Sequence, residues 1–149
     1  MFILTKNFTR QKLNQKYLNK VAEVALKVIK LKKQTEISLV ILGEKRIRSL
    51  NRKYRNIDKV TDVLSFGNEK AKNKSAKFIS PPCNVLHLGE IFICYTQAKK
   101  QAKEKKHSVK REMEILLIHG ILHLAGYDHK GNYEYSEMKI LEEKILTAL

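Results

Sequence analysis

The chain has 149 residues, with 30 Lys and Arg against 15 Asp and Glu, which gives a formal net charge of +15. At 43% hydrophobic residues, a chain of this length can bury roughly two thirds of its unfolded surface, which argues against a disordered protein. Its two cysteines, Cys83 and Cys94, form no CxxC motif, which excludes a disulfide framework and a four-cysteine zinc site. We therefore expect one domain over residues 1–149 in a reducing, cytoplasmic setting.

In chain order, the hydrophobic pattern predicts a mixture of strands and helices. Strands are expected at 2–5, 37–42, 60–66 and 85–94, and helices at about 10–31, 44–55, 96–105 and 133–146. Ser108 is the expected N-cap of a further helix, and Gly89 an expected kink in the last strand. Residues 67–84 combine Gly, Asn, Ser, Lys and Pro-Pro, which predicts a mobile basic loop. Because strands and helices are interspersed without strict alternation, we expect an α+β fold with a small mixed sheet packed with helices.

The excess of positive charge lies in the first three quarters of the chain. Residues 1–111 hold 27 basic and 8 acidic residues, whereas residues 112–149 hold 3 and 7. Such a distribution suits a polyphosphate partner such as a nucleic acid. Lysines outnumber arginines 24 to 6, so a compositional bias toward solvated lysines is an equally simple explanation.

Two classes of protein are disfavoured by the sequence. The longest stretch free of Asp, Glu, Lys and Arg, from Ile115 to Tyr127, is far shorter than the ~20 residues that cross a bilayer, and the first ten residues do not resemble a secretory signal. Neither GxGxxG nor GxxxxGK[ST] occurs, so no nucleotide cofactor is expected.

Three of the five histidines fall in the segment HGILHLAGYDH, residues 119–129. On a helix, His119 and His123 are one turn apart, about 6 Å along the axis, so both imidazoles can reach one metal ion. His129 joins them only if the chain turns back. Gly126 stands where this reversal is needed, because glycine adopts the left-handed conformation that ends a helix. The result is a three-histidine site with an open position for water, as in catalytic zinc sites.

The spacing H-x3-H-x2-G-x2-H is that of the metzincin proteases, except that Gly120 replaces the glutamate that follows their first histidine. Since that glutamate is the general base of proteolysis, peptide hydrolysis by this mechanism is disfavoured, whereas metal binding is not. The competing interpretation is that these are ordinary hydrogen-bonded histidines. Asp128 is either a hydrogen-bond acceptor for a ligand imidazole or a turn carboxylate.

HGILHLAGYDH resembles the signature of the YbeY family, ribosomal-RNA maturation factors described as metal-dependent, single-strand-specific endoribonucleases. Two other blocks are similar to the family: LN at 50–51 through Tyr54-Arg55, Asp58 and TDVLSF at 61–66, and LGEI at 88–91 with Ile93 and Cys94. The resemblance covers roughly residues 37–141. Gly67 and Glu90 depart from the family, which more often has Pro and Asp there.

The resemblance implies a zincin-like α+β fold with one Zn2+ per chain, bound at the end of a helix by His119, His123 and His129. It also implies that Arg55 lies near the metal and acts on the phosphate, although a solvated arginine near a helix C-terminus is the simpler interpretation. The implied partners are single-stranded RNA, ribosomal RNA, the small ribosomal subunit and a ribosome-associated GTPase, in ribosomal RNA maturation and ribosome quality control. The alternatives are a non-catalytic zinc-containing ribosome-assembly factor and a zinc metallohydrolase of another substrate class.

Overall fold

The computed structural model describes residues 2–31, 34–68, 85–128 and 132–149. Its elements are β1 (Phe2–Asn7), α1 (Gln15–Val28), β2 (Gln34–Leu42), α2 (Glu44–Arg55), β3 (Val63–Gly67), β4 (Val85–Cys94), α4 (Tyr95–Glu104), α5 (Val109–Leu124) and α6 (Asn132–Ala148). The described part therefore holds five helices and four strands, which confirms the predicted α+β class. Of the predicted loop at 67–84, Gly67 ends β3 and Asn68 follows it; the rest lies outside the described residues.

The four strands form one mixed sheet in the order β1-β2-β4-β3. Strands β1, β2 and β4 are parallel, whereas β3 pairs antiparallel with β4 and forms an edge of the sheet. The register between β2 and β4 shifts at Gly89, whose φ is +145°. The shift and the positive φ confirm the predicted irregularity of β4 at Gly89. A side chain at this position would meet the backbone oxygen of Phe66.

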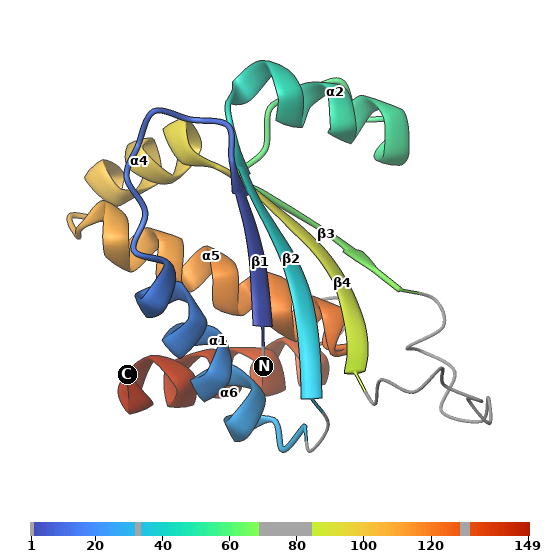
Figure 1. Cartoon of the computed structure of the whole chain (residues 1–149), viewed down its shortest axis with the longest axis vertical. Coiled ribbons are helices and arrows are strands. Elements are labelled where there is room, and N and C mark those ends of the chain that lie inside the picture. Colours follow the sequence, from blue (N-terminus) through green and yellow to red (C-terminus); the bar gives the residue numbers. More distant parts are fainter. Residues whose placement is uncertain (1, 32–33, 69–84, 129–131) are drawn as a thin grey trace.

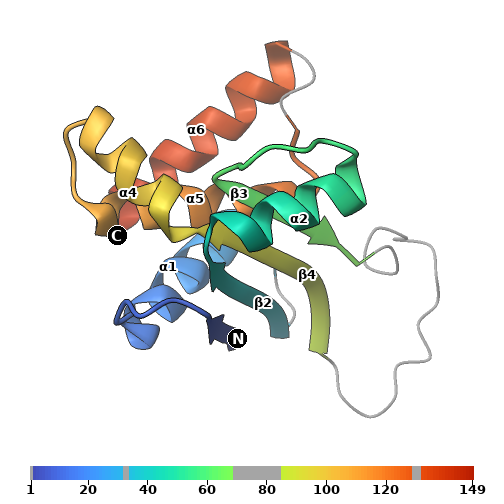
Figure 2. The same cartoon turned by 90° about the horizontal axis from the view of Figure 1, so that it is seen from above.

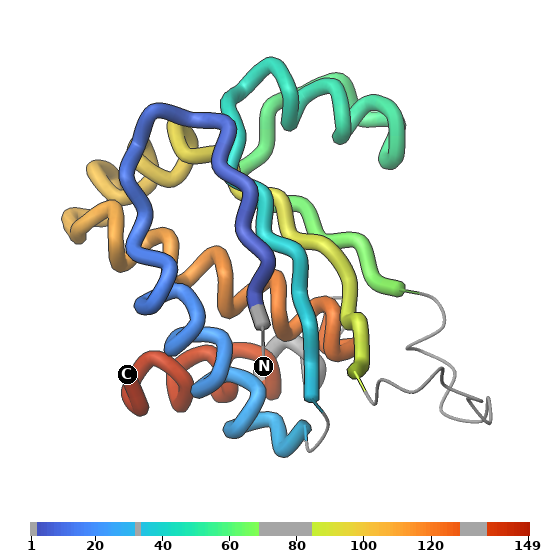
Figure 3. Tube along the Cα trace, in the orientation of Figure 1, coloured from blue at the N-terminus to red at the C-terminus, as the bar shows by residue number. Residues whose placement is uncertain are grey.

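The helices divide unequally between the two faces of the sheet (Figure 1). Helices α1, α5 and α6 lie together below the strands, where the trace in Figure 3 shows α6 beside α1. Their apolar side chains join those of β2 and β4, among them Ile37, Leu39 and Ile91, in the main core. Helix α2 lies on the other face, where Ile47 packs with Leu42, Leu64 and Cys94 in a second, smaller cluster (Figure 2).

Local capping signals set where helices α5 and α1 begin. The Ser108 hydroxyl accepts a hydrogen bond of 3.0 Å from the Arg111 amide, which confirms the predicted N-cap of α5. Helix α1 begins at Gln15, five residues later than predicted, because Asn14 is its N-cap and accepts a hydrogen bond from the Tyr17 amide. No helix in the described ranges is long and apolar enough to span a membrane.

Candidate metal and RNA site

His119 and His123 lie in the last turn and a half of α5, on the same side of the helix. Their Nε2 atoms face each other at 3.0 Å, and their ring centroids are 4.6 Å apart. Two nitrogens bound to one tetrahedral zinc ion at 2.0–2.1 Å lie about 3.3 Å apart, so this spacing fits two ligands of one ion. The predicted convergence of the first two imidazoles is therefore present in the fold.

Glu142 of α6 orients the first imidazole. Its Oε1 atom lies 2.8 Å from Nδ1 of His119. Because a carboxylate accepts hydrogen bonds, Nδ1 of His119 is the donor in this contact, and Nε2 is the ring nitrogen that faces His123. Metal-ligating histidines commonly have such a carboxylate behind the ring, where it fixes the tautomer and raises the basicity of the ligand.

The turn after α5 follows the prediction made for Gly126. The helix ends at Leu124, Gly126 has a φ of +100°, and the amides of Gly126 and Tyr127 donate to the carbonyls of His123 and Leu122. These two hydrogen bonds form a Schellman motif, in which the left-handed glycine reverses the chain. Residues after Gly126 therefore do not continue along the helix axis, as a third ligand from this segment requires.

His129, the third predicted ligand, lies outside the described residues. Within the described part of the chain, no three His, Cys, Asp or Glu side chains form a metal-binding group. The donor set that can be inspected, two facing imidazoles with a carboxylate behind one of them, fits a transition-metal ion.

Gly120 explains why the metzincin glutamate has no counterpart here. It lies on the face of α5 that packs against β4, and a Cβ at this position would come within 2.9 Å of Ile91 Cγ2. A glutamate here would meet the apolar side chain of Ile91. The close packing of α5 on β4 therefore disfavours a glutamate at position 120.

Arg55, the other predicted site residue, is the last residue of α2, and its side chain is exposed. Helix α5 packs in the main core and α2 in the second cluster, so the two helices lie on opposite faces of the sheet. In the described structure no hydrogen bond or ion pair joins Arg55 to His119 or His123. The position of Arg55 beside a metal ion stays a prediction.

Helix α2 is nevertheless the most basic element of the described structure near this site. It carries Lys45, Arg46, Arg48, Arg52, Lys53 and Arg55 against a single acid, Glu44. Arg48 is neutralised locally, because its Nε donates to Asp58 at 2.8 Å, and this hydrogen bond lowers the pKa of Asp58. The remaining cations leave α2 with a positive field that suits a phosphate backbone.

The other two described histidines differ in exposure. His87 is exposed, with Nδ1 3.3 Å from Glu36 Oε1. His107 is partly buried, and its Nε2 lies 2.5 Å from Glu112, a fully buried carboxylate that Lys105 also contacts. The sequence did not predict Glu112 as a partner of His107 or Glu142 as a partner of His119. The first contact depends on a loop and the second on the packing of α6, so neither belongs to a local motif.

Comparison with known proteins decides the family. The family model described as "Endoribonuclease YbeY" matches residues 3–149. The chain belongs to the YbeY family. It is 50% identical over 113 residues to the endoribonuclease YbeY of Heliobacterium modesticaldum, covering 75% of this chain and 68% of that protein. It is 41% identical over 141 residues to that of Dehalococcoides mccartyi strain CBDB1, covering 92% and 85%.

Solved structures support the fold. The solution structure of TM1509 from Thermotoga maritima superposes with a TM-score of 0.59 at 24% sequence identity, covering 99% of this chain and 91% of that one. The family model and the curated relatives confirm, across the chain, the resemblance to the YbeY family that the histidine segment indicated. Since the curated relatives are endoribonucleases, the chain is assigned to a family of RNA-cleaving hydrolases.

Proposed function

We propose that this protein is a metal-dependent endoribonuclease that cleaves single-stranded RNA in ribosomal RNA maturation and ribosome quality control. The single observation that carries the proposal is the pair of facing Nε2 atoms of His119 and His123, 3.0 Å apart and backed by Glu142. The endoribonuclease names of its relatives support the same reaction class.

The proposed metal is one Zn2+ per chain, held by His119, His123 and His129. When bound, such an ion supplies Lewis acidity to a water molecule and to a phosphoryl oxygen. The protein's own contribution is to hold the His119 imidazole in one orientation through Glu142, and to reverse the chain at Gly126, as a third ligand from this segment requires.

Arg55 is the proposed phosphate-binding residue. Its guanidinium is exposed at the end of a helix that carries five other cations, and the described residues place no carboxylate within ion-pair distance of it. A planar guanidinium binds two phosphoryl oxygens at once and stabilises the charge that develops there. Because α2 and α5, the helices that carry Arg55 and the histidine pair, pack on opposite faces of the sheet, we propose that the RNA strand crosses the β3 edge.

The proposed partners are ribosomal RNA, the small ribosomal subunit and a ribosome-associated GTPase, in the cytoplasm. For these partners the support is the family resemblance together with the basic surface of the chain, whose net charge is +15. We propose no membrane partner and no nucleotide cofactor.

The proposal is tested by measuring metal content and cleavage of single-stranded RNA in the same preparations. We expect His123→Ala to lose both metal and cleavage while its circular dichroism spectrum stays that of the wild type. The matched control is His87→Ala, which removes an exposed histidine of β4 and should retain both properties.

Full cleavage by His123→Ala would contradict the proposal. Turnover is also the property that separates an enzyme from a non-catalytic assembly factor. In that alternative, RNA binds without being cut, and chelation of the metal unfolds the protein.

A further inference from the structure

Three aromatic rings form a ladder that runs from the second core cluster to the surface beside Arg55. The Phe92 ring of β4 lies 5.7 Å from that of Phe66 on β3, and the Phe66 ring lies 5.3 Å from that of Tyr54 on α2, measured between centroids. Phe66 and Phe92 are partly buried, but Tyr54 has 58% of its surface exposed. The outermost ring therefore presents an aromatic surface to solvent that packing within the described structure does not use.

The charges around Tyr54 suit a nucleic acid. Lys53 Nζ lies 5.2 Å from the centroid of the Tyr54 ring, and Arg55 is its other neighbour in the chain. Proteins that bind single-stranded nucleic acids combine such cations, which contact the backbone, with aromatic rings on which bases stack. Tyr54 with Lys53 and Arg55 thus places an exposed aromatic ring next to two cations.

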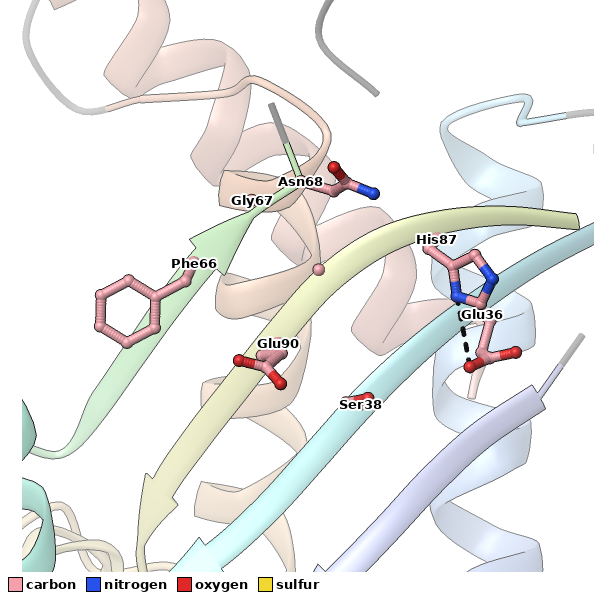
Figure 4. Close-up of a pocket in the computed structure, with 8 residues that line it drawn as sticks. Glu36, Ser38, Phe66, Gly67, Asn68, His87 and Glu90 are labelled. Carbon is pink, nitrogen blue, oxygen red and sulfur yellow. Dashed lines mark ion pairs between the residues drawn. The ribbon is translucent and has the colours of Figure 1, made fainter. Parts of the chain in front are cut away.

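The neighbouring surface restricts where a phosphate backbone can run. A cavity of about 350 Å³ on the open part of the sheet is lined by Glu36, Ser38 and Glu90, with Phe66 and Gly67 at its β3 side. Figure 4 shows both carboxylates on the sheet face, while the Phe66 ring points away from them. Because these carboxylates repel phosphates, the backbone is favoured on the side of α2, with its bases turned toward Tyr54 and Phe66.

We propose that Tyr54, supported from beneath by Phe66, is a stacking site for one base of the single-stranded RNA substrate. This inference rests on the proposed function, and it identifies a substrate-binding residue next to Arg55 on α2. Since every base has a π-face, stacking here favours unpaired over paired RNA without selecting a sequence. A base inside a duplex is already stacked on both sides and cannot occupy this site.

The test is fluorescence anisotropy with a short labelled 2′-O-methyl RNA, which resists cleavage, and with the same strand carrying abasic sites. We expect Tyr54→Ala to weaken binding of the complete strand roughly 5- to 100-fold, the range of one lost base stack. Binding of the abasic strand should not change. Tyr54→Phe keeps the ring and should bind as the wild type does.

The salt dependence distinguishes stacking from a phosphate contact. Tyr54→Ala should leave the slope of log affinity against log salt unchanged, whereas Arg55→Ala should reduce it by about 0.7. The matched control is Phe8→Ala. Phe8 is an aromatic residue about as exposed as Tyr54, at 53%, but the Arg46 guanidinium covers its ring at 4.3 Å from the centroid. This control should bind both strands normally.

The stacking site is overturned if the wild type binds the complete strand and Tyr54→Ala binds it equally well, or if Phe8→Ala weakens it as much. In those outcomes the proposed endoribonuclease function stands. Failure of the wild type to bind either strand at any salt concentration would overturn both proposals.

Discussion

Glu142 of α6 and His119 of α5 are joined by a 2.8 Å contact between Oε1 and Nδ1, so the last helix of the chain fixes the ring of the first proposed ligand. Without the carboxylate, the orientation and the tautomer of the His119 ring lose this support. We expect Glu142→Ala to weaken zinc affinity about 10- to 100-fold. Competition with a chromophoric chelator measures this change.

The neighbouring Glu143→Ala provides the matched control for that loss, because Glu143 is exposed on the same turn of α6. Its zinc affinity should equal that of the wild type. Equal affinities in both variants would show that Glu142 does not support the ligand.

Gly120 allows α5 to approach β4 closely. An added Cβ would lie 2.9 Å from Ile91 Cγ2 and 3.0 Å from its Cδ1, and both helix and strand belong to the main core. We expect Gly120→Ala to lower the free energy of unfolding by ~1–3 kcal/mol, the usual cost of overpacking. Urea denaturation measures it, with Gly43→Ala as control, since a Cβ there meets nothing within 4 Å. Equal stability of both variants would contradict the close approach.

Gly126 is required for a different reason, its backbone conformation. Its Cβ would meet nothing within 4 Å, but its φ of +100° is strained for any residue with a side chain. Gly126→Ala should therefore cost ~1–2 kcal/mol of stability through the backbone alone. Gly126→Asn should cost less, because asparagine tolerates positive φ better. Thermal or urea unfolding of the two variants checks the order, and a reversed order would exclude this explanation.

Tyr17 is predicted to titrate outside its usual range. Its hydroxyl is hydrogen-bonded to the buried carboxylate of Glu114, which raises the pKa of Tyr17 to about 12 from an ordinary 10.0. Because the folded state binds this proton more tightly, the stabilisation is complete below pH 10 and is lost as the pH rises toward 12.

Absorbance of tyrosinate during alkaline titration measures this shift. Tyr17→Phe should remove the absorbance change near pH 12. If the variant keeps that change, the hydrogen bond to Glu114 does not hold in solution.

Much of the fold was predictable because its signals are local. Ser108 caps α5, Gly126 ends it, and the apolar residues of 37–42 and 85–94 form strands at the expected places. The 3.6-residue period placed His119 and His123 one turn apart. The start of α1 was harder to predict. The helical pattern extends further toward the N-terminus, but the helix begins only after Asn14, which caps it.

The sequence by itself determined the family, the mixed secondary structure and the two imidazoles that face one another, since each depends on residues close together in the chain. Only the tertiary structure decided that β3 runs antiparallel at the edge, that Glu142 reaches His119, and that the Tyr54 ring packs at a tilt against Phe66. The two side-chain contacts join residues 23 and 12 positions apart, and the strand pairing joins residues 22 to 30 positions apart. They follow from how the helices pack on the sheet, and no local pattern encodes that packing.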